Sequence, residues 1–434
     1  MSAELISIIV LVAVFVIATT RSINMGALAF AAAFGVGELV ADFDTDTIFA
    51  GFPGDLFVVL VGVTYLFAIA RANGTTDWLV HASIRVVRGR IALIPWVMFV
   101  LTGALTAIGA VSPAAVAIVA PIALSFATRY GISPLLMGAM VVHGAQGGGF
   151  SPISIYGTIV NGIVERENLP GNEIALFLAS LVVNLVIAGI LFVVLGGLKL
   201  RGADDGTEAA GGKGADEGPD DEEKKGEVKK AEEDTRLTPA RIATLTALVA
   251  LVVAVLAFDL DSGLTSITLA VVLSACWPED SRNAVGQIAW PTVLLICGVL
   301  TYVAVLDEMG TIKWAGDGVS DIGIPLLASV LLCYIGAVIS AFASSVGIMG
   351  ALIPLAVPFL AQGEIGAIGM VAALAVSATV VDVSPFSTNG ALVLAAAPGV
   401  DRERFFRQLM MYGGIVVAVV PAVVWLALVV PGWG

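Results

Sequence analysis

Residues 144–157 read Gly-Ala-Gln-Gly-Gly-Gly-Phe-Ser-Pro-Ile-Ser-Ile-Tyr-Gly and lie between two apolar runs. A glycine triplet followed by Pro152 does not continue a helix. The sequence therefore predicts a helix that breaks at membrane depth. Because unpaired backbone groups are costly in hydrocarbon, such a break is tolerated only inside protein or beside a watery cavity.

This stretch has a second copy in the chain. Ser151-Pro152-Ile153-Ser154-Ile155-Tyr156-Gly157 is matched 233 residues later by Ser384-Pro385-Phe386-Ser387-Thr388-Asn389-Gly390. The same spacing separates Ser112 from Ser345. Two broken helices in matching places of two halves are the best sequence indication of a transporter binding site.

The composition excludes a soluble domain. Of the 434 residues, 58% are hydrophobic and the mean hydropathy is +0.99, with many apolar runs of membrane-spanning length. The net charge of −14 gives no reason to expect a nucleic-acid partner. The three cysteines lie singly in apolar segments, so neither a disulfide, a metal site nor a cofactor is expected, apart from a possible sodium ion.

The apolar pattern predicts an all-α polytopic membrane protein with two inverted repeats, 1–198 and 239–434. Each repeat has five crossings plus a re-entrant hairpin and a broken helix. The hairpins cover 92–128, cut at Ser112-Pro113, and 324–362, cut at Ser344-Ser345. The broken helices cover 134–165 and 367–397. The other spans are expected at 5–20, 25–41, 56–72, 174–198, 239–258, 262–277, 291–307 and 409–430, with interfacial helices at 74–90 and 310–321 and a basic amphipathic segment around Arg402, Arg404 and Arg407.

Residues 199–238 form a linker of Gly, Ala, Asp, Glu and Lys without aromatic residues, a composition that predicts disorder. It is either a solvated tether or a regulatory tail. On this topology every lysine and arginine except Arg166 and Lys313 lies on the linker side of the membrane. The positive-inside rule then predicts a cytoplasmic linker, both termini outside, and a location in the cell inner (plasma) membrane.

Four half-helices are expected to start near the midplane, after Ser112, Ser151, Ser345 and Ser384. Helix N-termini bind anions through free N–H groups and the helix dipole. No lysine or arginine lies within 130–165 or 314–401. We therefore predict a small anion held by backbone and polar side chains, although Ser-Pro could merely shape kinks. The predicted substrate-binding residues are Ser112, Pro113, Ser151, Pro152, Ser154, Ser344, Ser345, Ser384, Pro385, Ser387, Thr388 and Asn389.

Asp382 is a carboxylate deep in an apolar run, where a charge is costly and usually functional. A dianion that faces only helix dipoles stays under-neutralised, so we predict coupling to sodium or protons. The cation-coupling candidates are Asp382, His143, Gln146 and Gly148, with possible sodium near Ser112, Ser345, Ser151 and Ser384. Asp382 could instead make a structural hydrogen bond, and His143 could equally join two helices.

Three stretches carry a resemblance to a known family. Residues 23–30, 49–55 and above all 143–157 closely resemble the bacterial dicarboxylate carrier family MatC, associated with malonate uptake. The resemblance is strongest over residues 1–165 and extends over the chain apart from the linker. It implies a membrane carrier whose substrate is a small dicarboxylate.

The MatC family looks like a branch of the ion transporter superfamily that includes divalent-anion/sodium symporters. That wider resemblance implies a homodimer in which a transport domain moves against a scaffold in an elevator fashion. It also implies hairpin tips with Ser-Asn-Thr signatures, which would correspond here to Ser112-Pro113-Ala114 and Ser345-Val346-Gly347. These tips keep the serine and lose Asn and Thr, a departure that weakens the case for sodium.

The leading interpretation is a secondary transporter that imports small dicarboxylates, most of all malonate, by sodium or proton symport with alternating access. The alternative within transport is a sodium/proton antiporter of the same superfamily, which Asp382 and His143 would suit. An intramembrane enzyme would need paired catalytic groups, and the sequence offers two histidines and no His-Glu-x-x-His motif. A sensor or scaffold would need a folded signalling part, which the linker composition does not predict.

Overall fold

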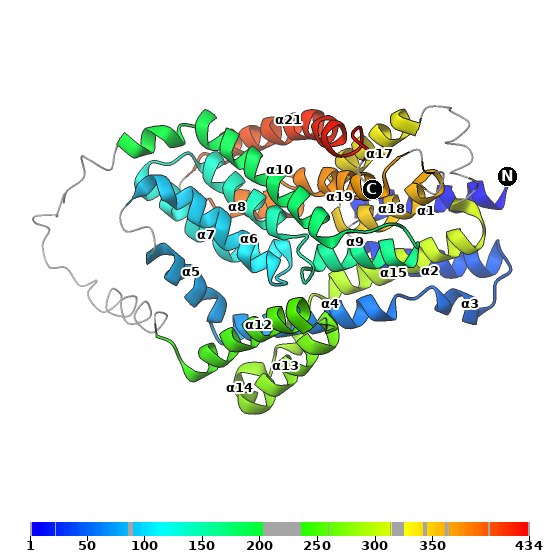
Figure 1. The fold of residues 1–434 in the computed structure, drawn as a ribbon, viewed down its shortest axis with the longest axis horizontal. Helices are drawn as coiled ribbons and strands as arrows, with labels where there is room; N and C mark the ends of the chain where they lie inside the picture. The colour runs from blue at the N-terminus through cyan, green and yellow to red at the C-terminus, as the bar shows by residue number, and fades with distance from the viewer. Residues whose placement is uncertain are drawn as a thin grey trace, which may run out of the picture.

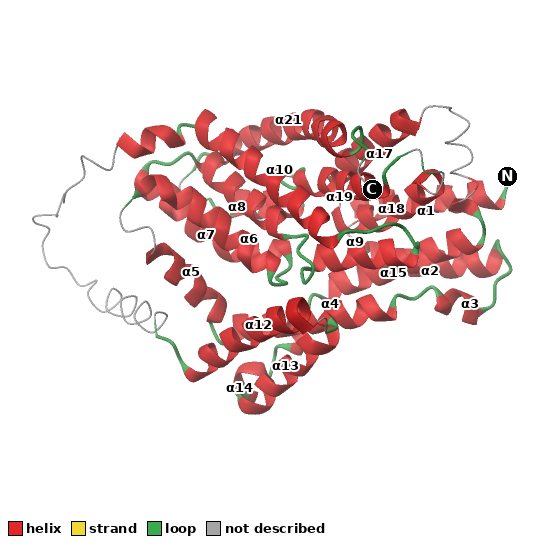
Figure 2. Cartoon of the chain, viewed as in Figure 1, coloured by secondary structure: helices red, strands yellow, loops and turns green. Residues whose placement is uncertain are grey.

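The computed structural model describes residues 2–21, 23–85, 90–202, 236–258, 260–312, 314, 325–341, 345–360, 363, 365–397 and 400–432. Within these ranges all regular elements are helices (Figure 2). Six of the described helices are long and apolar enough to cross a membrane, namely Gly54–Ala72, Ser112–Tyr130, Glu173–Val194, Pro239–Phe258, Trp290–Glu308 and Arg402–Leu428. The predicted all-α polytopic membrane class is thereby confirmed.

The first half follows the predicted order of elements (Figure 1). Helix α5 stands where the interfacial helix was expected, and α8 and α9 are the two parts of the first broken helix. The bounds are α1 Ala3–Arg21, α2 Met25–Leu39, α3 Thr45–Ala50, α4 Gly54–Ala72, α5 Thr75–Arg85, η1 Ile91–Leu93, α6 Ile94–Ala107, α7 Ser112–Tyr130, α8 Pro134–Gly148, α9 Ile155–Arg166, α10 Glu173–Val194 and η2 Gly197–Gly202.

The second half also follows the predicted order of elements, with α19 and α20 as the second broken helix. The bounds are α12 Pro239–Phe258, α13 Ser262–Cys276, α14 Pro278–Ser281, η3 Val285–Gln287, α15 Trp290–Glu308, α17 Pro325–Ser340, α18 Ser345–Leu360, α19 Ala367–Val380, α20 Thr388–Ala395 and α21 Arg402–Leu428. Most of the predicted linker, most of the interfacial piece at 310–321, and Ser344 lie outside the described residues.

One boundary differs from the prediction. The basic segment around Arg402, Arg404 and Arg407 and the last span form a single helix of 27 residues, α21. Asp401 caps it by accepting from the N–H groups of Glu403 and Arg404. Phe405 and Leu409 are buried on the same side as the residues that follow, and no helix breaker stands between the two segments.

The two halves are interleaved. Helix α2 packs against α15 and α4 packs against α13 (Figure 1). Glycines allow both close approaches: a Cβ on Gly26 would lie 1.8 Å from the Leu294 carbonyl oxygen, and one on Gly62 would lie 2.5 Å from the Gly263 carbonyl oxygen. Helix α7 contacts α20, and α18 contacts α9. The second arm of each predicted hairpin therefore contacts the broken helix of the other half, whereas the first arms, α6 and α17, pack on α8 and α19 of their own half.

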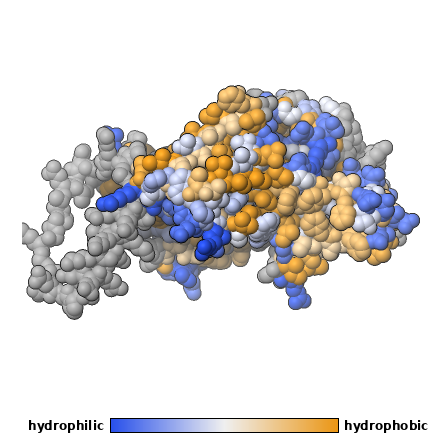
Figure 3. Space-filling view, turned by 90° about the horizontal axis from the view of Figure 1, so that it is seen from below, coloured by the Kyte–Doolittle hydropathy of each residue, from blue (hydrophilic) through white to orange (hydrophobic). Residues whose placement is uncertain are grey.

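The outer surface of the helices is apolar. Figure 3 shows hydrophobic side chains over the middle of one face, with hydrophilic ones both to the left of them and toward the right-hand end. On α10, for example, Val182, Val186 and Ile190 are each more than half exposed. Exposed apolar surface of this extent is suited to contact with lipid. The chain is accordingly a multi-pass membrane protein.

Candidate functional site

Both helix breaks have the same hydrogen-bonded design. Helix α9 is capped by Ser154, whose Oγ lies 2.7 Å from the Ser151 carbonyl oxygen and accepts from the Gly157 N–H at 3.1 Å. Helix α20 is capped by Ser387 in the same way, with its Oγ 2.7 Å from the Ser384 carbonyl oxygen. The prediction that these half-helices start directly after the Ser-Pro pairs is therefore wrong. The chain turns for three more residues, and the second serine of each motif is the cap.

The motif glycines are required by packing. A Cβ on Gly157 would lie 2.0 Å from the Ser151 carbonyl oxygen, and one on Gly390 would lie 1.9 Å from the Ser384 carbonyl oxygen. Real side chains do not come that close to backbone, so any other residue would push the turn off its cap. The matching Ser-Pro-x-Ser-x-x-Gly motifs thus encode one local structure twice.

Backbone carbonyl groups near the end of α8 accept hydrogen bonds from neighbouring helices. The Ala145 carbonyl accepts from Thr106 Oγ1 at 2.8 Å, and the Gln146 carbonyl accepts from Ser180 Oγ at 3.0 Å. The first bond provides a donor for the Ala145 carbonyl at the helix break, and the second adds one to the Gln146 carbonyl, which also accepts from the Gly149 N–H. A Cβ on Gly148 would lie 1.9 Å from the Gly103 carbonyl oxygen. The structure thus gives the cation-coupling candidate Gly148 a packing position against α6.

A buried polar cluster forms where the two breaks meet. Asp382 Oδ2 accepts from Gln146 Nε2 at 3.1 Å and from Asn389 Nδ2 at 3.0 Å. Asn389 Nδ2 also lies 2.8 Å from Ser112 Oγ. All four residues are buried, and the amide oxygens of Gln146 and Asn389 have no hydrogen-bond partner within the described residues. The cluster therefore joins a carboxylate to two unpartnered oxygen ligands.

The helix N-termini offer fewer free donors than predicted. The Asp382 carboxylate lies against the start of α20, next to Asn389, so this positive helix end already faces an anion of the protein. At the start of α7, Pro113 has no N–H, and the N–H groups of Ala114 and Ala115 both donate to the Val111 carbonyl. A ligand at these helix ends would depend more on side chains than the sequence suggested.

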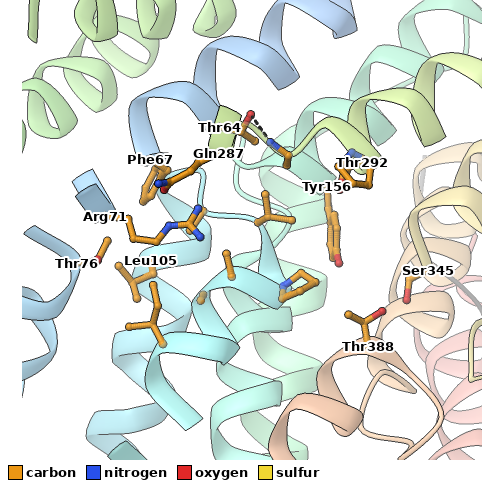
Figure 4. A pocket seen from close by; sticks show the side chains of 18 of the residues that line it. Thr64, Phe67, Arg71, Thr76, Leu105, Tyr156, Gln287, Thr292, Ser345 and Thr388 are labelled. Atoms are coloured by element: carbon orange, nitrogen blue, oxygen red, sulfur yellow. Dashed lines mark hydrogen bonds between the residues drawn. The ribbon is translucent and has the colours of Figure 1, made fainter. Parts of the chain in front are cut away.

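A cavity of about 400 Å³ lies between α4, α7, α15 and the two breaks. Four predicted site residues line it: Pro113, Ser345, Asp382 and Thr388. Figure 4 shows Ser345 and Thr388 together at one end, with Tyr156 reaching toward them. Ser345 Oγ also accepts from Ser340 Oγ at 2.7 Å.

Other predicted site residues stand away from the cavity wall. The hydroxyl groups of Ser154 and Ser387 are committed to their turns, and Ser151 Oγ donates to the Ala107 carbonyl. Pro152 lines a different cavity. Ser112, Gln146 and Asn389 are not among the residues that line the cavity. Gln146 and Asn389 are hydrogen-bonded to Asp382, which does line it, and Asn389 is also bonded to Ser112.

Sequence reasoning missed the polar groups at the other end of the cavity. They are Arg71, Thr76 and Gln287, from α4, α5 and η3 (Figure 4). Arg71 entered the sequence analysis only as a positive charge that sets orientation. The glycine, proline and serine patterns point only to the helix breaks, and no pattern in the chain joins the end of α4 to η3.

His143 is fully buried and both ring nitrogens have partners. Nδ1 lies 2.8 Å from Asn184 Oδ1, and Nε2 bonds the Tyr412 hydroxyl. A neutral ring with its proton on Nδ1 satisfies both neighbours, because Asn184 donates its amide N–H to the Ser180 carbonyl. Of the two roles left open, the geometry favours a hydrogen bond that joins α8, α10 and α21.

A second cavity, of about 710 Å³, lies at the far end of α9. An ion pair between Arg166 and Asp55 joins α9 to the start of α4 there. Glu167 is partly buried beside them. Burial and the nearby Asp307 raise its pKa to about 6, against the opposing effect of Arg166. Among the described residues, no group of three or more His, Cys, Asp or Glu side chains could hold a metal ion.

One comparison with known proteins found a match to a family model. Residues 1–149 match the model of the dicarboxylate carrier protein MatC N-terminus. The match covers α1 to α8, including the Ser112 helix start and Gln146. No curated protein matches the chain. The resemblance to MatC-type dicarboxylate carriers is confirmed by this match, which spans the N-terminal third of the chain.

Proposed function

We propose that this protein is a secondary carrier that imports small dicarboxylates, with malonate the leading substrate. The observation that carries the proposal is the match of residues 1–149 to the N-terminus of the dicarboxylate carrier MatC. The many apolar helices and an internal cavity that reaches the two helix breaks support it. These features suit a protein that moves a ligand across a membrane rather than one that transforms it.

The substrate is proposed to bind in the cavity near Ser345 and Thr388, close to the tip of α7. The hydroxyl groups and the helix N-terminal dipoles are suited to a carboxylate group. The cavity volume of about 400 Å³ is large enough to hold a three- or four-carbon diacid together with water. Selection between malonate and longer diacids would then depend on how far apart the two carboxylates find donors.

Asp382 is the residue that we propose couples the substrate to a cation. It lines the cavity and, among the described residues, forms no ion pair. A dianion that enters beside this carboxylate meets a like charge in a poorly hydrated site. We propose that a proton or a sodium ion on Asp382 must accompany the substrate, with the free amide oxygens of Gln146 and Asn389 available to a sodium ion. Because the cation and the dianion would then cross the membrane together, the proposed transport is symport.

The packing of the helices is the basis for the proposed repeats and domains. The crossed packing of α2 with α15, α4 with α13, α7 with α20 and α18 with α9 supports two inverted repeats. We further propose that α2, α4, α13 and α15 belong to a scaffold, that the hairpins and broken helices move against it as an elevator, and that the carrier is a homodimer. The linker side is cytoplasmic and both termini are outside.

A sodium/proton antiporter is the second candidate, because an uncompensated buried carboxylate between two amides could exchange cations without an organic anion. Counterflow separates the two functions. Liposomes that contain the purified protein are loaded with unlabelled malonate and diluted into labelled malonate. Dicarboxylate transport predicts transient accumulation of label, inhibited by other short diacids and not by acetate. Absence of counterflow, with sodium-dependent proton movement present, would support the antiporter and reject the carrier.

A further inference from the structure

The cavity has two polar ends. Figure 4 shows Ser345 and Thr388 at one end and Arg71, Thr76 and Gln287 at the other, where the apolar side chains of Phe67 and Leu105 lie beside them. Asp382 belongs to the lining as well. The end that carries Arg71 is not explained by the helix breaks or by their cation chemistry.

Arg71 is available to a ligand. It stands in the last turn of α4 and is exposed, and its guanidinium forms no hydrogen bond or ion pair with any residue that the structure describes. Every other described residue that lines the cavity is neutral or acidic. A guanidinium presents two parallel N–H donors that match a carboxylate, and it keeps its charge at any physiological pH.

Thr76 supplies an independent sign of a ligand at this end. Its side chain is 3% exposed, it lines the cavity, and its Oγ1 has no hydrogen-bond partner in the described structure. The neighbouring Thr75 hydroxyl, by contrast, bonds Asn73 Oδ1 at 2.5 Å. A buried hydroxyl without a partner is costly, and a bound carboxylate oxygen would provide one. Gln287 adds an amide from η3 on the opposite wall.

We infer that Arg71, Thr76 and Gln287 form an anion subsite at the open end of the cavity, on the proposed cytoplasmic side, where an imported carboxylate passes after it leaves Ser345 and Thr388. The identity of the anion as a dicarboxylate rests on the proposed function, whereas the presence of an anion site does not. The subsite offsets the negative charge of Asp382 along the path between the cavity and the cytoplasmic side. It also favours carboxylates over cations at this end of the cavity.

A charge probe in the cavity tests this inference without requiring transport. Ile118 lines the cavity and is half-buried. Ile118→Cys is made in a Cys276→Ser background, because Cys276 is exposed while Cys297 and Cys333 are buried. The purified protein is labelled with a sulfonate-bearing and with an ammonium-bearing methanethiosulfonate reagent of similar size. The ratio of the two rates reports the local potential.

We expect Arg71→Gln to lower the anion-to-cation rate ratio by about tenfold, from the loss of one nearby charge in a partly screened site. Arg71→Lys should keep most of the ratio. Arg21→Gln, which removes an exposed arginine from the last turn of α1, should not change it. Malonate should slow sulfonate labelling when Arg71 is present, and less so in Arg71→Gln or Thr76→Val.

An unchanged rate ratio in Arg71→Gln would overturn the inference. A thiol at position 118 that neither reagent reaches would also overturn it, because the proposed subsite requires an open cavity. A ratio that depends on Arg71 in a protein without malonate counterflow would keep the anion subsite and reject the dicarboxylate function. The two failures are therefore distinguishable.

Discussion

Replacing Asp382 by asparagine should uncouple dicarboxylate binding from its cation. The amide has the shape of the carboxylate, and its oxygen can still accept from Gln146 Nε2 and Asn389 Nδ2. Its N–H₂ group would replace the second carboxylate oxygen. The variant therefore removes a negative charge from the cavity lining with little change in packing.

The expected size of the effect follows from Coulomb's law. A substrate carboxylate in contact with the cavity wall would lie roughly 5 Å from Asp382. With an effective dielectric constant of about 20, two like charges at that distance repel by about 3 kcal/mol. A coupling cation removes this repulsion in the wild type, and the substitution removes it permanently. In the absence of the coupling cation, Asp382→Asn should bind malonate about a hundredfold more tightly than the wild type.

Calorimetric titration of the purified protein with malonate measures this, with pH and sodium varied separately. Glu38→Gln is the matched control, because it removes an exposed negative charge outside the cavity lining. Asp382→Asn should lose the dependence of malonate affinity on the coupling cation, whereas Glu38→Gln should keep it. Equal cation dependence in Asp382→Asn and wild type would refute the reasoning.

Three further predictions concern the rest of the structure. Gly157→Ala and Gly390→Ala should each destabilise the protein by about 2–4 kcal/mol, since the new Cβ meets a carbonyl oxygen. Thermal unfolding in detergent measures this, and Gly414→Ala, which has open space around it, should be silent. His143→Phe should lower stability by about 2–4 kcal/mol by leaving the Asn184 Oδ1 atom and the Tyr412 hydroxyl without their partner, yet keep the pH profile of malonate counterflow; a shifted profile would restore His143 as a titrating group. Because burial raises the pKa of Glu167 from 4.5 to about 6, its contribution to stability is complete below about pH 4.5 and is lost as the pH rises through 6. Glu167→Gln should flatten that part of the curve of stability against pH, whereas Glu165→Gln, at an exposed neighbour, should not.

Much of the fold could be predicted because membrane spans follow from local composition. The break in 134–165, its copy in 367–397 and the hairpin cut at Ser112 each came from glycine, proline and serine in an apolar context. These features act over a few residues, so the chain alone reveals them. The caps were placed three residues too early because Ser-Pro is a common helix start, while the turn stabilised by Gly157 is longer than that signal suggests.

The site itself was only partly predictable. Asp382 and Gln146 were singled out as polar residues in apolar runs, but only the fold shows that their side chains bond to each other across 236 residues of sequence. The role of Gly148 in packing depends on the position of α6. Arg71 could not be found, because its membership of the cavity depends on how α4, α5 and η3 meet. Such contacts between distant segments carry no local pattern.

The central claim is cation-coupled import of a dicarboxylate, and accumulation of labelled malonate in liposomes that contain the purified protein tests it most directly. Sodium and proton gradients are imposed separately, on wild type and on Asp382→Asn. The account predicts accumulation above equilibrium under one of the two gradients in the wild type, and only equilibration in the variant. Malonate uptake that ignores both gradients, or accumulation that survives in Asp382→Asn, would contradict it.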